Sequence, residues 1–521
     1  MYDILIIGGG GAALSAAIEA KLSGAKVILV TENYPTRSQT SMAQGGINAA
    51  LANVKEDSID LHIKDTMRSA KSLADERMVK RLCSLAPDTI EWLNSIGVPF
   101  SRLEDGKIAQ RQMGGASSIR ACYSQDYTGL KILHTLYDYA LGLGVEFLNE
   151  HHLLNLCRCD DRVCGATFLD IRETKIKEIL AKATILATGG YAGVYNNHTT
   201  NSYQSTGDGI VAAYNVGANL SNLEFIQFHP TALKGRGVLI SESARGAGGK
   251  LINDRGEEFV DELSTRDEVA LAIKKEIDSG REVFLDLRGV GEEFIDKNLP
   301  QERRLCKIFA GIDVVKEPIP ISPAAHYTMG GVTVDENFQS SVDALYAVGE
   351  CSNARVHGAN RLGGNSLLEI VAFGRECAKS ALNREINGTC RSNQLEIDKQ
   401  MIEDIFQKEP TISFYKKQDE LSKSLFSDLG IVRDEKGLKA ILSFTDDLES
   451  NLSLMGINDR SRVYNSNLLD FLKFKNSLKL SNLIAKLALD REESRGAHKR
   501  FDFPDIDPRW DKESIISKEI S

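Results

Sequence analysis

The sequence lacks an apolar run long enough to cross a membrane, and it lacks an excess of positive charge. No stretch approaches the roughly 18–20 apolar residues that a transmembrane helix needs. The 73 acidic residues outnumber the 63 lysines and arginines, and the net charge is −10. This acidic balance disfavours nucleic acid as a partner. The first predicted strand begins at Tyr2, which leaves no room for a cleaved signal peptide, so we expect a cytoplasmic protein.

Cysteine is also sparse and follows no metal-binding pattern. The nine cysteines are scattered along the chain, and their odd number suits a reducing compartment. One cluster, Cys157, Cys159 and Cys164, falls in two predicted strands over 153–159 and 163–170. We interpret these three as strand residues rather than as a metal or redox site. The remaining composition, 42% hydrophobic and 26% charged over 521 residues, is typical of a globular protein of about two to four domains.

What the sequence does have is a glycine-rich turn near its start. The apolar run Ile4–Ile7 has the length of a buried strand, and Gly8, Gly10 and Ala13 follow it in the pattern G-x-G-x-x-A before a predicted helix. A second strand ends at Glu32, 24 positions after Gly8. Small residues let the backbone approach a pyrophosphate, and a helix N-terminus offers it free N–H groups. The unit predicts a bound dinucleotide, either NAD or FAD, with a plain strand–helix turn as the alternative.

Two later segments repeat the pattern of a buried strand that ends in small residues. These strands are predicted over 183–187 and 344–348, and each leads into a glycine. Between them, Asp208 begins a predicted helix, and the segment 223–329 is rich in histidine, arginine and carboxylate. We interpret 223–329 as a domain inserted into the nucleotide-binding domain.

Two other stretches have the periodicity of helices. Residues 58–96 are predicted to be helical with a break available at Pro87, and residues 396–489 place Leu, Ile and Phe at three- and four-residue spacings. We see no candidate chemistry in 396–489. The remainder, 491–521, is charged and rich in turns.

The inserted segment and the residues just after it hold the strongest group of polar side chains. Arginine forks match carboxylates in a bidentate way, and a fixed group of cations with histidines forms an anion clamp. Taken singly, each member has a structural explanation, such as a surface ion pair for Arg266 or a core histidine for His229. The prediction rests on their joint presence beside a dinucleotide site: His229, Ser241, Glu242, Arg245, Arg266, His326 and Arg361.

The chain resembles the flavoprotein subunits of succinate dehydrogenase and fumarate reductase, together with the related L-aspartate oxidases. The resemblance extends from Tyr2 to Pro508. It rests on several long motifs without gaps, which are residues 35–46, 126–129, 134–137, 187–190, 229–231, 241–246, 326–331, 357–368 and 493–498.

This resemblance implies an α/β fold in three parts. A Rossmann-like FAD-binding domain covers 1–222 and 330–395, a capping domain over 223–329 is inserted into it, and a C-terminal helical domain with a tail covers 396–521. FAD lies in the first domain, and the substrate lies between the flavin and the capping domain. The residues implied to bind FAD are Gly8, Gly10, Ala13, Glu32, Ser38, Thr40, Gly45, Gly46, Thr188, Gly189, Asp208, Glu350, Asn365, Ser366 and Leu367.

The resemblance also assigns roles in the reaction. Arg266 exchanges the proton, and Glu242 and Arg245 relay protons to it. An arginine is a poor general acid because its pKa exceeds about 12, so this role requires positioned proton transfer. No metal is implied. The residues implied to hold a dicarboxylate are His229, Ser241, His326 and Arg361.

Three departures from the family pattern modify these expectations. Respiratory members carry a histidine at the position of Gln39 that bonds covalently to the flavin and raises its potential. Gln39 cannot form that bond, so we expect non-covalent FAD, and succinate oxidation is disfavoured. Aspartate oxidases carry a glutamate at the position of Met113 that pairs with the substrate amine, and Met113 offers no charge. The chain also ends soon after Trp510, which implies that part of the partner-facing surface is absent.

We therefore expect the flavoprotein subunit of a fumarate reductase or succinate dehydrogenase, which interconverts fumarate and succinate by hydride transfer with FAD. Electrons pass through an iron–sulfur partner subunit, because no cysteine pattern here can hold a cluster. A membrane-anchor subunit is a second candidate partner and would hold the chain on the inner face of the membrane. Two alternatives stay open: a soluble L-aspartate oxidase, and a flavin-bearing structural subunit without activity.

Overall fold

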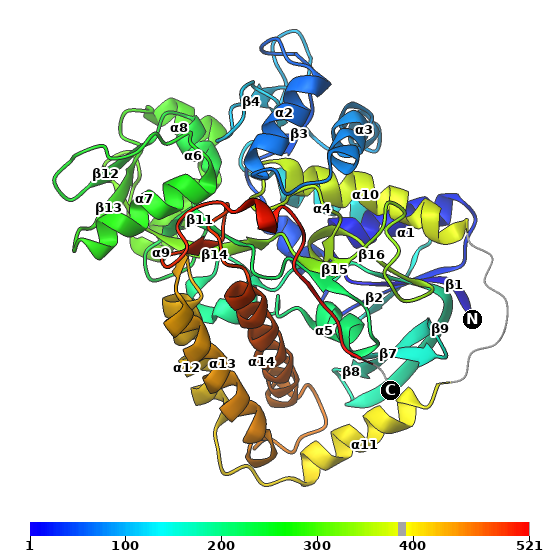
Figure 1. Ribbon diagram of the computed structural model, residues 1–521. Coiled ribbons are helices and arrows are strands. Elements are labelled where there is room, and N and C mark those ends of the chain that lie inside the picture. The colour runs from blue at the N-terminus through cyan, green and yellow to red at the C-terminus, as the bar shows by residue number, and fades with distance from the viewer. Residues whose placement is uncertain (384–391, 520–521) are drawn as a thin grey trace.

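The computed structural model describes residues 1–383 and 392–519, and a mixed sheet with strand order β6-β2-β1-β9-β8-β7 forms its centre (Figure 1). Residues 384–391, at the expected end of the FAD-binding domain, and 520–521 of the tail lie outside this description. The parallel strands are β6 (Glu146–Asn149), β2 (Val27–Thr31), β1 (Tyr2–Ile7), the second half of β9 (Lys175–Leu186) and β16 (Leu345–Ala347). The antiparallel strands β8 (Arg162–Asp170) and β7 (His151–Cys159) extend the sheet from the first half of β9.

The carboxyl ends of the parallel strands meet at one edge of this sheet. Ile7 of β1 lies opposite Val30 of β2 and Leu186 of β9, and Ala347 of β16 also lies opposite Leu186. Helix α1 (Gly11–Leu22) starts soon after β1 and packs against α4 (Thr128–Gly142) and α10 (Asn365–Leu382). The segments that follow β1, β2, β9 and β16 therefore gather at the edge where open α/β sheets bind ligands.

The helical stretch expected over 58–96 forms two helices, and its break does not fall at Pro87. Helix α2 (Ile59–Ser69) ends early, and Pro87 lies inside α3 (Glu76–Ser95). The chain turns at Lys71 and Ser72, which have positive φ angles of 52° and 63°. Asp75 then caps α3 by accepting a hydrogen bond from the backbone N–H of Arg77. The turn and the capping carboxylate set the boundary, and the proline does not.

A second sheet, with strand order β11-β14-β13-β12, lies within the segment expected to be inserted. Its antiparallel strands are Ile226–Leu233, Ile319–Thr328, Val283–Asp286 and Lys250–Asn253, and its helices are α6 (Glu242–Gly246), α7 (Arg266–Asp278), α8 (Glu292–Asn298) and α9 (Pro300–Ala310). A separate hydrophobic core, drawn from residues between Leu233 and Ile321, holds this green lobe together (Figure 1). The α/β class with a second lobe is the expected one, and the limits at 223 and 329 stay a prediction.

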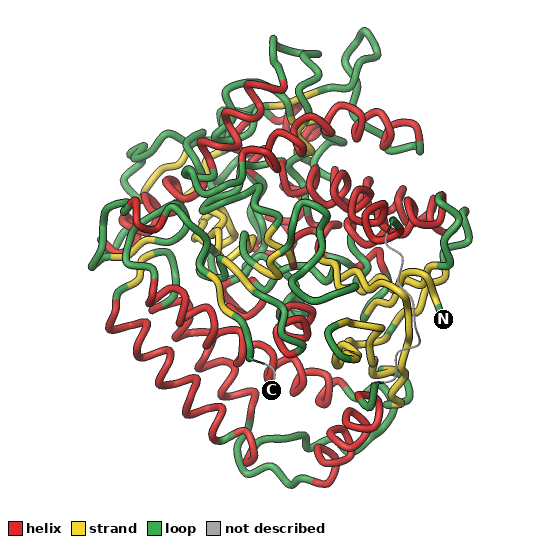
Figure 2. Tube along the Cα trace, turned by 45° about the vertical axis from the view of Figure 1, so that its right-hand side comes forward, coloured by secondary structure: helices red, strands yellow, loops and turns green. Residues whose placement is uncertain are grey.

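The C-terminal part is helical, as expected. Helix α11 (Gln394–Gln407) packs on β7, β8 and β9, and three longer helices lie side by side in Figures 1 and 2: α12 (Phe414–Asp428), α13 (Glu435–Ser450) and α14 (Ser466–Asp490). Helix α14 also packs on α5 (Asp208–Asn215). No helix within residues 1–383 and 392–519 is long and apolar enough to span a membrane.

Short strands complete the fold: β3 (Ile47–Asn48), β4 (Gln110–Arg111), β5 (Ala121–Cys122), β10 (Leu220–Ser221), β15 (Gly331–Thr333), β17 (Ser352–Asn353), β18 (Val432–Arg433), β19 (Lys499–Arg500) and β20 (Ile515–Ile516).

A buried ion-pair network ties the tail to the body of the protein. Glu493 accepts hydrogen bonds from Arg491 at 2.8 Å and from Arg495 at 2.8 and 2.9 Å, and also from the backbone N–H of Asp507. Arg491 in turn pairs with Glu224, which lies just before β11, at 2.7 Å. All four ion-paired side chains are buried. Removal of the Glu493 carboxylate therefore leaves the two buried guanidinium groups with one acidic partner each, Glu224 for Arg491 and Asp511 for Arg495.

We predict that Glu493→Gln destabilises the folded protein by about 3 kcal/mol, the low end for a broken buried pair, because the amide cannot neutralise Arg491 and Arg495 but each arginine keeps one acidic partner. Thermal unfolding of the variant and the wild type at equal concentration measures this as a lower Tm. The neighbouring Glu492→Gln is the matched control, because Glu492 is exposed. Equal Tm values for Glu493→Gln and the control would contradict the structural role of the network.

Candidate active site

A cavity opens at the carboxyl edge of the main sheet, where the dinucleotide is expected. Its walls come from the segments after β1, β2 and β9, from the 37–43 loop and from the start of α10. His326 and Arg361 line the same cavity, so the expected cofactor and substrate regions are continuous. Most of the residues expected to bind the cofactor line it: Gly8, Gly10, Glu32, Ser38, Thr40, Thr188, Gly189, Asp208, Glu350, Ser366 and Leu367.

The cavity wall has the features that a dinucleotide requires. Gly8 has a φ of 131°, and a Cβ there would clash with the carbonyl oxygen of Ala187. The N-cap of α1, Gly10, has no side chain to cap the helix, and the Thr40 hydroxyl accepts from the N–H of Gly11 at 3.1 Å, so the other free N–H groups can take a pyrophosphate. Three wall atoms, Oε1 of Glu32, Oγ of Ser38 and Oγ1 of Thr188, are buried and have no hydrogen-bond partner among the described residues. These atoms are free to bind a ligand.

Four expected cofactor residues do not line the cavity. Ala13 is buried in α1. A Cβ at Gly45 would lie 2.6 Å from Cε of Met113, and one at Gly46 would lie 2.8 Å from a backbone carbonyl oxygen. The side chain of Asn365 forms hydrogen bonds with buried residues of the protein. The small size of the first three is explained by packing behind the wall, and their contacts with the cofactor stay predictions.

Asn365, the first residue of α10, is held by a buried network that the sequence did not indicate. Its Oδ1 accepts hydrogen bonds from Nδ2 of Asn48 at 2.8 Å and from Nε2 of His62 at 2.9 Å, and its Nδ2 donates to Thr66 at 2.9 Å. Burial and the nearby charge of Arg120 lower the pKa of His62 to about 4. A neutral His62 therefore fixes the start of α10 without adding charge.

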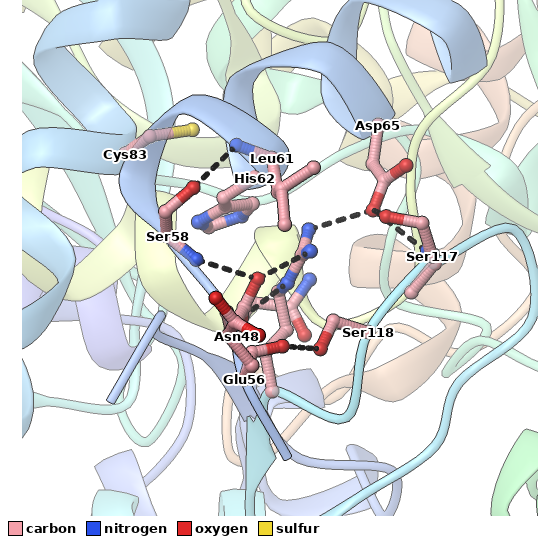
Figure 3. Close-up of polar contacts among 12 residues, drawn as sticks. Asn48, Glu56, Ser58, Leu61, His62, Asp65, Cys83, Ser117 and Ser118 are labelled. Atoms are coloured by element: carbon pink, nitrogen blue, oxygen red, sulfur yellow. Dashed lines mark hydrogen bonds and ion pairs between the residues drawn. The ribbon is translucent and has the colours of Figure 1, made fainter. Parts of the chain in front are cut away.

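The element that carries His62 is itself held by a buried ion-pair cluster. Arg120 pairs with Asp57 and with Asp65 of α2, both at 2.9 Å. Asp65 also accepts hydrogen bonds from the backbone N–H and the hydroxyl of Ser117 (Figure 3). The cluster fixes α2 against the 117–120 segment. Because α2 carries His62, the cluster also supports the start of α10 indirectly.

A side chain from the C-terminal helices pairs with two carboxylates at the far end of the cavity. Lys473 of α14 places its Nζ 2.9 Å from Glu32 and 3.4 Å from Asp208. His152 lies 2.7 Å from the same Glu32 carboxylate. Burial alone would raise the pKa of Glu32, but Lys473 and His152 lower it to about 2. Glu32, His152 and Asp208 lie close enough to share a metal ion, but the ammonium of Lys473 supplies the cation there.

The seven residues expected to bind and protonate the substrate come from five parts of the chain. His229 lies on β11 and His326 on the neighbouring β14, with ring centroids 4.8 Å apart. Ser241 caps α6, whose first turn carries Glu242 and Arg245, and Arg266 begins α7. Arg361 precedes α10. The hydroxyl of Ser241 is engaged by Ser243 within α6, so its contact with substrate stays a prediction.

The three residues expected to relay protons lie in contact with one another, and their role stays a prediction. Arg266 donates to Oε2 of Glu242 through Nε at 3.0 Å and through Nη2 at 2.5 Å. Nη2 of Arg245 lies 3.6 Å from the other oxygen, Oε1, of Glu242. Glu242 thus lies between two guanidinium groups, and a side chain at Gly114 would clash with it. The glycine leaves room for this carboxylate.

Gln227 is a site residue that we missed. Its Nε2 donates to Asn360 at 2.7 Å and to the carbonyl oxygen of Arg361 at 2.9 Å, which fixes the orientation of the amide. Its Oε1 accepts from Arg266 at 3.1 Å and from Arg361 at 3.2 Å. Both arginines therefore donate a hydrogen bond to the same neutral oxygen, Oε1 of Gln227. The signal in the sequence is the two-residue spacing to His229, which places both on one face of β11.

Burial dominates the electrostatics of this cluster. It lowers the pKa of His229 and of His326 far below the usual range, and neighbouring arginines add to the effect, so both imidazoles are neutral at pH 7. Burial and Arg266 lower the pKa of Arg361 to about 10. Burial would raise the pKa of Glu242, but Arg266 and Arg245 outweigh it, and the carboxyl is ionised. Among the described residues, Glu242 is the one carboxylate within 4 Å of any of these three guanidinium groups, which leaves an excess of two positive charges among the groups in contact.

Known proteins resemble this chain in sequence and in fold. Residues 3–367 match the FAD binding domain family, and residues 418–521 match the fumarate reductase flavoprotein C-terminal family. The chain is 37% identical over 561 residues to the succinate dehydrogenase flavoprotein subunit of Coxiella burnetii, which covers 99% of this chain and 94% of the relative. It is also 37% identical over 525 residues to the flavoprotein subunit of the 8-methylmenaquinol:fumarate reductase of Wolinella succinogenes, covering 96% of this chain and 86% of the relative.

In three dimensions the chain matches a chain of Escherichia coli quinol fumarate reductase with a TM-score of 0.95 and 33% identity, covering 99% of this chain and 94% of that one. The chain belongs to the succinate dehydrogenase and fumarate reductase flavoprotein family. It is an FAD-dependent oxidoreductase of this family, and FAD is the dinucleotide of the cavity.

Both positions that depart from the pattern of this flavoprotein family lie close to the site. Gln39 lines the FAD cavity, and its Oε1 accepts a hydrogen bond from the backbone N–H of Ser202 at 2.9 Å. Thr200, in the same segment, contacts Nδ1 of His326 at 2.7 Å. Met113 is buried against Gly45 and precedes the glycine that makes room for Glu242.

We predict that Lys473→Met weakens FAD binding by at least about tenfold, because the partly buried Glu32 and Asp208 then lie together without a lysine cation. Titration of the apoprotein with FAD, followed by quenching of flavin fluorescence, gives the Kd. Lys486→Met, exposed on the same helix, is the control and should match the wild type. An unchanged Kd for Lys473→Met would show that α14 only packs against this end of the site.

Proposed function

We propose that the chain is the flavoprotein subunit of a fumarate reductase or succinate dehydrogenase, which interconverts fumarate and succinate. The observation that carries this proposal is the excess of two positive charges in a buried cluster that joins the FAD cavity through His326 and Arg361. A dicarboxylate dianion supplies the two missing charges. Arginine forks also match carboxylate geometry, which an ammonium cannot do in the same way.

The residues on the cavity wall account for how the cofactor is held. Gly8, Gly10 and the start of α1 would take the pyrophosphate, and Oε1 of Glu32 would take a ribose hydroxyl. Burial raises the pKa of Glu350 to about 7, so its carboxyl can donate as well as accept a hydrogen bond at neutral pH. When bound, FAD supplies the hydride exchange with the carbon–carbon bond of the substrate.

Arg361 is the substrate-binding residue in this proposal. Its Nε is buried without a hydrogen-bond partner among the described residues, and its guanidinium carbon lies 4.2 Å from the ring centroid of Tyr327. The aromatic face holds the guanidinium flat without neutralising it. Neutral His229 and His326 can donate hydrogen bonds without adding charge. Clamping both carboxylates polarises the C2–C3 bond and stabilises charge that develops in the transition state.

Arg266 exchanges the proton with the substrate carbon. A guanidinium holds its proton strongly, so transfer requires a partner that replaces the proton at once, and an ionised carboxylate can do so only by taking a proton from a further donor as it gives one to Arg266. Glu242 is that partner, because Arg266 donates two hydrogen bonds to it. Arg245, on the other side of Glu242, completes a path away from the substrate.

An iron–sulfur subunit is the proposed electron partner, and a membrane-anchor subunit is a further proposed partner that would hold the complex at the membrane. Several relatives are named as subunits of larger enzymes, which supports an assembly. Within residues 1–383 and 392–519, no group of cysteines lies close enough to bind a metal. A carrier outside the described chain is therefore proposed to move electrons to or from FAD.

L-Aspartate oxidation is the second candidate and is disfavoured by Met113. This side chain is buried, its methyl group packs at Gly45, and it offers no charge to a substrate ammonium. The cluster also already holds excess positive charge, which repels an amine. An ammonium left unpaired in a site closed to water costs about 1–3 kcal/mol or more.

We predict that Arg266→Lys lowers the rate of fumarate reduction with a reduced viologen dye by about 100-fold or more. Lysine keeps the charge but moves the donor away from Glu242 and Gln227, so a positioned proton transfer is lost. Dicarboxylate binding, followed by its perturbation of the flavin spectrum, should persist because Arg361 remains. Arg288→Lys, an exposed arginine of the same lobe, is the control. Turnover near the wild type in Arg266→Lys, with equal flavin content, would show that the proton comes from elsewhere.

We predict that the FAD is held without a covalent bond. The amide of Gln39 is not a nucleophile at neutral pH, and it is engaged with the 200–202 segment. Acid precipitation of the protein should release the yellow colour into the supernatant. Fluorescent flavin that stays on the polypeptide in a denaturing gel would overturn this prediction.

A further inference from the structure

Two buried carboxyl groups meet where the capping lobe contacts the FAD-binding body. Asp126 lies just before α4, and Glu302 lies in the first turn of α9 (Figure 1). Both side chains are 0% exposed. The backbone N–H of Glu302 donates to Oδ2 of Asp126 at 3.0 Å, although 176 positions separate the two residues in sequence. Neither residue belongs to the relay described above.

Asp126 caps a helix of the other lobe. Helix α9 begins at Pro300, which has no N–H, and the next N–H groups, of Gln301 and Glu302, point to the Asp126 carboxylate. A negative side chain at this position satisfies free donors and complements the helix dipole. The FAD-binding body therefore holds the start of α9 by a side chain rather than by packing alone.

Glu302 also contacts the segment that carries the proposed proton relay. Its Oε1 accepts a hydrogen bond from the backbone N–H of Ser241 at 2.8 Å. Ser241 is the N-cap of α6, and the next residue is Glu242. Hydrogen bonds thus lead from Asp126 through Glu302 to Ser241, the residue before the relay carboxylate Glu242. A shift of Glu302 would move Glu242 relative to Arg266.

In both carboxyl groups, one oxygen has no hydrogen-bond donor among the described residues. Oδ1 of Asp126 and Oε2 of Glu302 are buried and have no hydrogen-bond partner among the described residues. Burial raises the pKa of Asp126 to about 6. It raises that of Glu302 to about 8, with the Asp126 charge adding to the effect. Arg111 faces both groups but forms no ion pair with either among the described contacts, and the Cys306 thiol is neutral because burial raises its pKa. At pH 7 the pair holds one proton, mainly on Glu302.

We propose that Asp126 and Glu302 form a proton-sharing carboxyl pair that positions α6, and with it Glu242, against the FAD-binding body. This inference rests on the proposed relay through Glu242 and Arg266. The shared proton lets two acid groups lie buried together, as two carboxylates cannot. Both residues are positioning residues, because neither contacts the expected substrate or cofactor.

The direction of the pH dependence follows from the raised pKa values. An acid whose pKa is raised by folding stabilises the folded arrangement while it is protonated, and this contribution is lost as pH rises through the folded pKa. The pair therefore weakens as pH rises through about 8. Both the closure of the lobe on the body and the position of Glu242 should suffer at pH 9.

Glu302→Gln separates the shared proton from the shape of the side chain. The amide oxygen can still accept from Ser241, and its NH₂ supplies a permanent donor toward Asp126. We expect the ratio of kcat at pH 9 to kcat at pH 7, for fumarate with a reduced viologen dye, to be at least about fivefold larger in the variant than in the wild type. Glu293→Gln, exposed on α8, should keep the wild-type ratio.

A second measurement does not depend on fumarate. The drop in Tm of the FAD-bound protein between pH 7 and pH 9 should be smaller in Glu302→Gln than in the wild type. An equal drop in both would overturn the proton-sharing pair, whatever the substrate. A smaller drop with an unchanged kcat ratio would overturn the positioning role. Absence of fumarate reduction in the wild type, with a smaller Tm drop in the variant, would refute the proposed function and leave the pair standing.

Discussion

Three guanidinium groups share one carboxylate in a space that the two lobes close off from water, and the neighbouring side chains are arranged around that imbalance. The nearby imidazoles are neutral, because a further positive charge would be costly beside Arg266 and Arg361. A single amide oxygen, from Gln227, accepts from both arginines. The ring of Tyr327, which carries no charge, lies against the guanidinium of Arg361. None of these contacts removes the charge, and a dianionic ligand is the partner that completes the site.

The fold brings this charge to the cofactor by inserting one lobe into another. The body supplies a parallel sheet whose carboxyl ends gather the FAD-binding turns at one edge. The inserted segment returns through β14, so that the two ends of the lobe, β11 and β14, lie side by side and bring their histidines together. The expected substrate site depends on the contact between the lobes, because α6 and α7, with the expected relay residues, belong to one lobe and Arg361 to the other. The C-terminal helices likewise contact the cavity wall, because Lys473 pairs with Glu32.

The sequence predicted the parts of the fold and site that depend on local pattern. The strand, glycine turn and helix after Tyr2 form as expected, because small residues and apolar runs act within a few positions of each other. The prediction of a break at Pro87 was wrong, because capping by Asp75 decided the boundary. Lys473 and Glu302 could not be predicted, because each contacts a partner far away in sequence. A single lysine or glutamate in a helical pattern is normally expected to be exposed to solvent. Gln227 left a weak signal, its spacing to His229.

The most direct test of the central claim follows the flavin itself through one turnover. The purified flavoprotein is reduced without oxygen and mixed with fumarate, and the return of oxidised flavin absorbance is recorded together with the product. A buried site with two unpaired positive charges predicts rapid reoxidation with one succinate formed per flavin. It also predicts that L-aspartate leaves the oxidised flavin unchanged. Reduced flavin that persists in the presence of fumarate, while L-aspartate reduces the oxidised form, would contradict this account.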